Sequence, residues 1–155
     1  MHEDPHWHRK IELADRGLHN LLNQWQNWAQ SEPIPLRIRF DPVDFPRLLP
    51  WIILCEVLSA PPAFDARVRY MGSEIVQNFN GQNCTGMRVS ELEPVFARRW
   101  TDVGDKVVTA RGAVFFEGRP FMVDKAFALF EMLALPLSKA GESIDFLVLA
   151  LARSE

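Results

Sequence analysis

The sequence is poor in cysteine and has no long uninterrupted hydrophobic segment. Its only cysteines, Cys55 and Cys84, are too few for a disulfide framework or a structural zinc site. The longest apolar stretches, 51–54 and 126–137, are shorter than the about 18 residues that a membrane-spanning helix needs, and Glu131 interrupts the second. The first ten residues lack the apolar stretch of a secretory signal. We therefore expect a cytoplasmic protein with no membrane partner.

Positive charge is also not in excess. Lys and Arg number 17 against 20 Asp and Glu, and the formal net charge is -3. A nucleic-acid-binding domain usually carries a basic field, so we expect no nucleic-acid partner. The 155 residues are 48% hydrophobic, which is typical of a globular protein with a substantial core.

Histidine is confined to the N-terminal region, at His2, His6, His8 and His19. The first three could chelate a metal loosely, but no apolar neighbours would order them before the metal arrived. We interpret this segment as a frayed terminus and assign no metal.

No catalytic constellation is apparent either. Ser73, Thr85 and Ser90 have no histidine in the same region to activate them, and no glycine-rich phosphate loop occurs. The sequence therefore predicts a protein that is not an enzyme.

An amphipathic helix is predicted over residues 9–29, because apolar residues recur there at intervals of three and four. Its apolar face either packs on the chain's own domain or pairs with a second copy in a homodimer. The second alternative makes five residues candidates for a dimer interface: Ile11, Leu18, Leu21, Trp25 and Trp28. Pro33 and Pro35 end the helix. We divide the chain into an N-terminal tail and helix over 1–32 and a domain over 33–155.

The remainder combines strands with short helices. Apolar and β-branched runs predict strands, while capping residues and helical periodicity predict helices. The strands are expected at 51–58, 64–71, 113–116, 125–137 and 144–152, and the helices at 73–79 and 94–110.

Four segments in this order resemble a bacterial family of stand-alone PAS-domain proteins. They are 34–50 (IPLRIRFDPVDFPRLLP), 67–76 (RVRYMGSEIV), 83–86 (NCTG) and 130–137 (FEMLALPL). The resemblance implies an α+β PAS fold, in which helices lie on one face of a five-stranded antiparallel sheet, with the amphipathic helix as an N-terminal addition. It also implies a sensory or regulatory role. The chain has no room for an effector domain, so we expect a homodimer that signals by contact with a separate protein.

Haem and flavin are both disfavoured as cofactors. Haem-binding PAS domains usually provide an axial histidine from the long helix, but every histidine here precedes the domain. The segment 81–84 (GQNC) resembles the photoactive-cysteine motif of flavin-binding PAS domains. That motif continues with an arginine and a glutamine, whereas this chain continues with Thr85, Gly86 and Met87. We therefore interpret Cys84 as an ordinary thiol.

The cavity of a PAS domain lies between its helices and its sheet. The topology suggests six residues for it: Tyr70, Phe79, Trp100, Val103, Val107 and Glu131. Glu131 is either a carboxylate that faces a ligand or partner, or one that forms a salt bridge to an arginine such as Arg69 or Arg111. Two functions follow. The first is a sensor that binds a small ligand, and the alternative is a ligand-free interaction adaptor in which side chains fill the cup.

Overall fold

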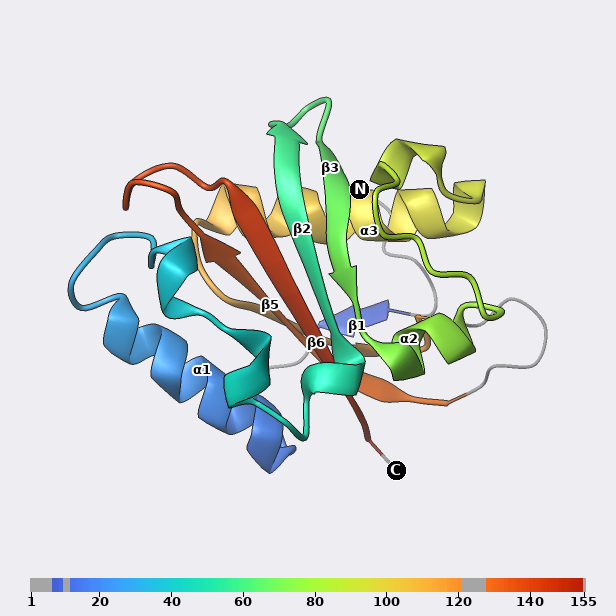
Figure 1. Ribbon diagram of the computed structural model, residues 1–155, viewed down its shortest axis with the longest axis horizontal. Helices are drawn as coiled ribbons and strands as arrows, with labels where there is room; N and C mark the ends of the chain where they lie inside the picture. The colour runs from blue at the N-terminus through green and yellow to red at the C-terminus, as the bar shows by residue number, and fades with distance from the viewer. Residues whose placement is uncertain (1–6, 10–11, 121–127, 155) are drawn as a thin grey trace.

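The computed structural model describes residues 7–9, 12–120 and 128–154. Within them an antiparallel sheet has the strand order β1-β4-β5-β6-β2-β3 (Figure 1). The strands are β1 Trp7–Arg9, β2 Ile52–Ser59, β3 Asp65–Met71, β4 Val114–Gly118, β5 Phe130–Leu137 and β6 Phe146–Arg153. Strands β2 to β6 confirm the expected five-stranded sheet.

The additional strand β1 corrects the interpretation of residues 7–9 as part of a frayed terminus, and the rest of that segment lies outside the described residues. The backbone of β1 pairs with the edge strand β4, with Trp7 opposite Gly118 and Arg9 opposite Phe116. Pairing with a sheet edge satisfies backbone groups that would otherwise be exposed, which is how a short terminal segment can be held in place.

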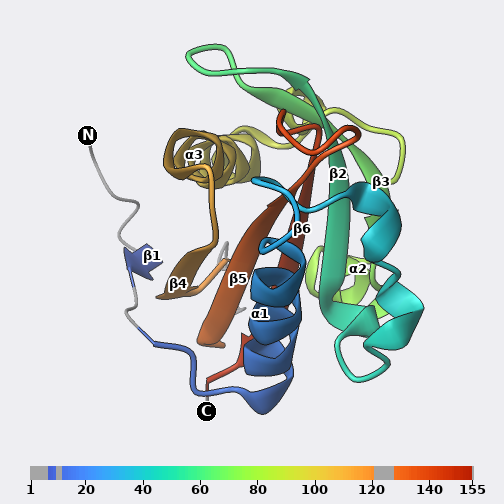
Figure 2. The same cartoon turned by 90° about the vertical axis from the view of Figure 1, so that its left-hand side faces the viewer.

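The helices lie on both faces of the sheet. Helix α2 (Ser73–Asn78), helix α3 (Pro94–Ala110) and the 3-10 helix η4 (Val89–Glu91) pack against one face, and α1 (Arg16–Trp28) packs against the other (Figure 2). Three further 3-10 helices connect α1 to β2: η1 Arg37–Arg39, η2 Pro42–Asp44 and η3 Leu49–Trp51. The sheet therefore separates two hydrophobic clusters, and every residue of β5 is buried.

Helix α1 begins later than the spacing of apolar residues predicts. Asp15 has an extended backbone, and its carboxylate accepts a hydrogen bond from the backbone N–H of Leu18 at 3.0 Å. This is the geometry of an N-cap, so the helix starts at Arg16. Leu18 and Leu21 are fully buried against the sheet.

A hydrogen bond from Trp25 fixes α1 to β5. The indole Nε1–H donates to the carbonyl oxygen of Pro136 at 2.9 Å. The pairing of β4 with β5 stops at Ala134, so Pro136 has no partner on β4. A proline, which has no backbone N–H, is therefore tolerated at this end of β5. The carbonyl oxygen of Pro136 accepts the hydrogen bond from the indole.

Candidate functional site

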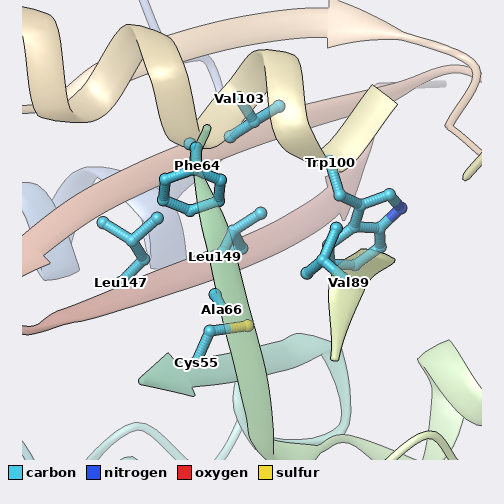
Figure 3. A pocket seen from close by; sticks show the side chains of 9 residues that line it. Cys55, Phe64, Ala66, Val89, Trp100, Val103, Leu147 and Leu149 are labelled. Atoms are coloured by element: carbon cyan, nitrogen blue, oxygen red, sulfur yellow. The ribbon is translucent and has the colours of Figure 1, made fainter. Parts of the chain in front are cut away.

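Two small voids lie beneath α3 among the residues that the structure describes, and Figure 3 shows one of them. The first is lined by Cys55, Phe64, Ala66, Val89, Trp100, Val103, Gly104, Leu147 and Leu149. The second is lined by Ile53, Val68, Met71, Phe79, Cys84, Leu92 and Trp100. Each has a volume of about 10 Å³, and a single water molecule requires about 10–15 Å³ in the same measure.

Trp100 lines both voids. It lies on α3, one helical turn before Val103, and its half-buried indole packs against the cluster between α3 and the sheet. The position of this one side chain therefore controls how much space exists on either side of it.

The ring of Phe64 packs beneath α3 and lines the first void. Phe64 precedes β3, is 7% exposed and reaches α3 at Gly104. A Cβ atom built at position 104 would lie 2.2 Å from Cε2 of the phenyl ring, so only glycine permits this approach. Neither Phe64 nor Gly104 was predicted from the sequence as a site residue. The available signal was an isolated glycine within the apolar stripe of a helix, which often marks a close contact.

Four of the six candidate cavity residues do lie between α3 and the sheet. Phe79 and Trp100 line a void, as does Val103. Val107 is fully buried in the same cluster but lines neither void. The structure thus brings these four side chains together as parts of a packed core.

The prediction that Tyr70 lines the cavity was wrong, because Tyr70 lies on the face of the sheet that α1 covers. It packs against the hydrophobic cluster between α1 and the sheet, and its hydroxyl donates a hydrogen bond to the backbone carbonyl of Leu49 at 3.0 Å. The pairing of β2 with β3 shifts register between Leu54 and Cys55, which pair with Tyr70 and Val68 respectively. This bulge interrupts the alternation of side chains, so Val68 and Tyr70 face opposite sides.

Glu131 also lies on the α1 side of the sheet, together with Leu133 and Leu135. It is 1% exposed, and its carboxylate accepts hydrogen bonds from the backbone N–H groups of Ala14, at 2.8 Å, and Asp15, at 2.7 Å. The cavity assignment was therefore wrong, and the carboxylate instead holds the chain that leads into α1.

The two arginines suggested as partners of Glu131 make other contacts. Arg69 binds Glu56, and Arg111 donates to the carbonyl oxygen of Glu142. Neither of these two contacts involves Glu131, whose carboxylate accepts from the N–H groups of Ala14 and Asp15.

The candidate dimer residues on α1 face the chain's own sheet. Leu18, Leu21 and Trp25 are buried there, and Trp28 is half-buried against the same cluster. Ile11 lies outside the described residues. Helix α1 therefore packs on the chain's own domain, the first of the two alternatives. Its buried side chains Leu18, Leu21 and Trp25 are not available to a second copy.

Both cysteines are buried within the core. Burial raises the pKa of the Cys55 thiol to about 12, and it raises the pKa of Cys84 as well. The backbone N–H of Cys84 points toward Sδ of Met71 at 3.3 Å. A raised pKa keeps each thiol protonated and unreactive at neutral pH.

Neither a metal cluster nor a membrane-spanning helix occurs in the part of the chain that the structure describes. No group of three or more His, Cys, Asp and Glu side chains comes together among these residues. None of their helices is long and apolar enough to cross a bilayer.

The family model described as PAS domain matches residues 14–150. The chain belongs to the PAS domain family. The matched segment includes α1 as well as the whole of β2 to β5. No curated protein and no solved structure gave a match. PAS domains are generally sensory or regulatory modules.

Proposed function

We propose that this PAS domain is a non-enzymatic regulatory module with a filled core, which acts by contact with a separate protein. The single observation that carries the proposal is the packing beneath α3, where Phe64 lies directly on Gly104 and Trp100 occupies the space between two voids. A module without an internal ligand must receive or pass its signal through its surface.

The size of the voids supports this choice over a sensor with a large cofactor. Each void has about 10 Å³, whereas pockets for organic ligands usually have about 300–1,000 Å³. Haem or flavin in this space would have to displace the ring of Phe64 and the indole of Trp100, and the displaced aromatic surface would lose its burial.

Mass spectrometry under native and denaturing conditions tests the proposal. We expect the native protein to have the mass of the polypeptide, or of its dimer, with no additional component. An extra mass that disappears on denaturation would overturn the filled-core proposal and favour the ligand sensor. The same spectrum tests whether the protein forms a homodimer. We propose that it does, through a surface other than the buried face of α1.

A small apolar ligand is the second candidate function, and the lining of the two voids favours it. All the residues that line them are apolar or sulfur-containing apart from the indole N–H of Trp100. Movement of Trp100 would connect the spaces on its two sides. Such a ligand would stabilise the protein against thermal unfolding in proportion to its concentration, whereas the filled core responds to no added apolar compound.

A further inference from the structure

One end of the sheet face that carries α1 extends beyond this helix, toward the β2–β3 hairpin (Figure 1). Glu56 of β2 and Phe146 of β6 are opposite each other in register at this end. Cationic side chains from η1, β3 and the β5–β6 turn surround them. We call this surface the Phe146 patch: Arg37, Glu56, Arg67, Arg69, Lys139 and Phe146.

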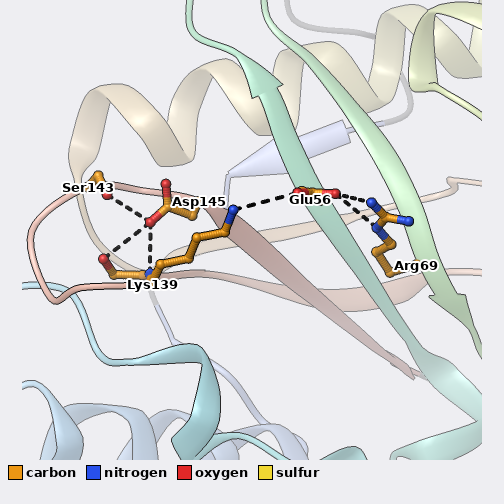
Figure 4. Close-up of polar contacts among 6 residues, drawn as sticks. Glu56, Arg69, Lys139, Ser143 and Asp145 are labelled. Atoms are coloured by element: carbon orange, nitrogen blue, oxygen red, sulfur yellow. Dashed lines mark hydrogen bonds and ion pairs between the residues drawn. The ribbon is translucent and has the colours of Figure 1, made fainter.

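Glu56 is the carboxylate at the centre of the patch. It accepts a hydrogen bond from Nε of Arg69 at 3.0 Å and lies 3.8 Å from Nζ of Lys139 (Figure 4). The hydrogen bond from Arg69 is the main reason that its pKa is lowered, and the charges of Lys139 and Arg67 act in the same direction. A single carboxylate thus attracts several cations to one place.

Phe146 supplies an aromatic surface between two of these cations. Nζ of Lys139 lies 5.8 Å from the ring centroid, and Cζ of Arg37 lies 5.9 Å from it. Cations are attracted to aromatic rings at such distances. The ring is half-buried, so its remaining surface lies among positive charges.

Positive charge in the patch exceeds negative charge. The nearby Asp145 is engaged within its own turn, where it accepts hydrogen bonds from the backbone N–H of Lys139 and the hydroxyl of Ser143. The cationic side chains remain open to solvent, since Lys139 is 64% exposed and Arg69 is 50% exposed. This local excess contrasts with the net charge of -3 of the whole chain.

We propose that the Phe146 patch binds an acidic peptide segment of a partner protein, an inference that rests on the proposed function and names the surface through which it acts. Carboxylates of the segment would pair with Arg69 and Lys139, and an apolar residue would contact the ring of Phe146. Ile38 is next to Arg37 in the chain and is 87% exposed, which provides further apolar surface.

The composition of the patch favours a peptide over a nucleic acid. A phosphate backbone requires a run of cations that follows its regular negative charge. A peptide carries a few carboxylates with apolar residues between them, which matches a small group of cations around an aromatic ring.

The experiment measures fluorescence anisotropy of a labelled synthetic peptide in which glutamates flank a leucine, titrated with the full chain. We expect saturable binding that weakens with salt, and no binding of a peptide in which lysines replace the glutamates. In the double variant Arg69→Gln and Lys139→Gln, the dissociation constant should rise at least about tenfold, because both exposed charges of the patch are lost. Phe146→Leu, which keeps an apolar side chain without the aromatic ring, should weaken binding by a smaller factor.

The matched control is Arg47→Glu, since Arg47 is an exposed arginine that precedes β2, at the opposite end of that strand from Glu56. This variant should bind the acidic peptide as the unchanged protein does. Equal loss in Arg47→Glu and in the double variant would show attraction to total charge only and would overturn the proposal. Binding of the lysine peptide, or no binding of the acidic one, would also overturn it.

Two further readouts separate this proposal from its alternatives. Analytical ultracentrifugation of the double variant tests whether the patch is instead an interface between two copies of the chain. If the unchanged protein is a dimer that binds no peptide, and the double variant is a monomer, the patch binds a second copy and the proposal is overturned. A small molecule retained in the native mass spectrum would overturn the filled core and leave the peptide titration unaffected. The two proposals can therefore fail independently.

Discussion

The phenyl ring of Phe64 lies against Gly104 of α3, closer than any side chain at position 104 would allow. This contact brings the helix close to the sheet, and the two voids that Trp100 lines among the described residues have about 10 Å³ each. In a fold whose helices and sheet can enclose a ligand, it is the structural basis for proposing a regulatory module that works by surface contact.

Substitution of Gly104 by alanine tests this contact. The added Cβ would overlap the phenyl ring, so Gly104→Ala should lower the free energy of unfolding by about 1–3 kcal/mol despite the higher helix propensity of alanine. Urea denaturation followed by tryptophan fluorescence measures the change. Gly112→Ala is the control, because the nearest atom to its new Cβ would be 3.8 Å away. Restored stability in the double variant with Phe64→Leu would attribute the loss to the ring, and an unchanged stability of Gly104→Ala would contradict the packing.

Removal of the Trp100 side chain should create a cavity that is large enough to be filled. Trp100→Ala should join the spaces on its two sides and lower the free energy of unfolding by about 3 kcal/mol, the lower end for tryptophan because the side chain is half-buried. Benzene should then raise the melting temperature of the variant, since empty apolar cavities bind such molecules.

The unchanged protein is the control for this effect, because we expect its melting temperature not to respond to benzene. A comparable response in both proteins would show that a cavity already exists, which contradicts a filled core. Trp28→Ala provides a second comparison, since Trp28 is also half-buried but packs on the opposite face of the sheet.

Glu131 should stabilise the start of α1. Glu131→Ala removes the acceptor for the N–H groups of Ala14 and Asp15, which should lower the free energy of unfolding by about 1–3 kcal/mol. Hydrogen exchange followed by mass spectrometry should show faster exchange in the peptide that contains these two amides. Glu12→Ala, at an exposed position close in sequence to the same amides, should leave their exchange unchanged. Unaltered protection in Glu131→Ala would refute the anchoring role.

Burial of Cys55 should make stability depend on pH in the alkaline range. Its pKa is about 12 in the folded protein, against an ordinary value of 9.0. Below pH 9 the thiol is protonated in both states. Above it the unfolded chain loses the proton first, so this thiol should lower the free energy of unfolding by up to about 1.4 kcal/mol per pH unit.

Urea denaturation between about pH 8 and pH 10.5 measures this dependence. Cys55→Ala should show a shallower decrease over the same range, whatever its stability at pH 8, because the titrating group is absent. Iodoacetamide at about pH 8 should alkylate neither thiol of the folded protein as fast as it alkylates the unfolded chain. Equal slopes for the two proteins would contradict a buried, protonated Cys55.

The order and type of β2 to β6 and of α1 to α3 could be predicted from local patterns. The strand expected at 51–58 is β2 at Ile52–Ser59, and the helix expected at 94–110 is α3 at Pro94–Ala110. The spacing of apolar residues and the positions of prolines are local features of the sequence. They therefore predict helices and strands without knowledge of the tertiary structure. The same is true of the four motifs that resembled the PAS family.

Tyr70 and Glu131 show what those patterns could not supply. Alternation along a strand is reversed by a bulge, and the register shift that moves Tyr70 to the α1 face depends on how β2 pairs with β3. The prediction that Glu131 shares a face of β5 with Leu133 was correct. Which helix covers that face depends on the placement of α1 and α3, and it is α1.

By itself the sequence determined the succession of β2 to β6 and of α1 to α3, the family and the amphipathic character of α1. The tertiary structure decided that α1 covers its own sheet, that Phe64 meets Gly104 and that Phe146 lies among cations from separate segments. The physical reason is that contacts between residues far apart in the chain depend on strand pairing and on the packing of whole elements, neither of which leaves a local pattern.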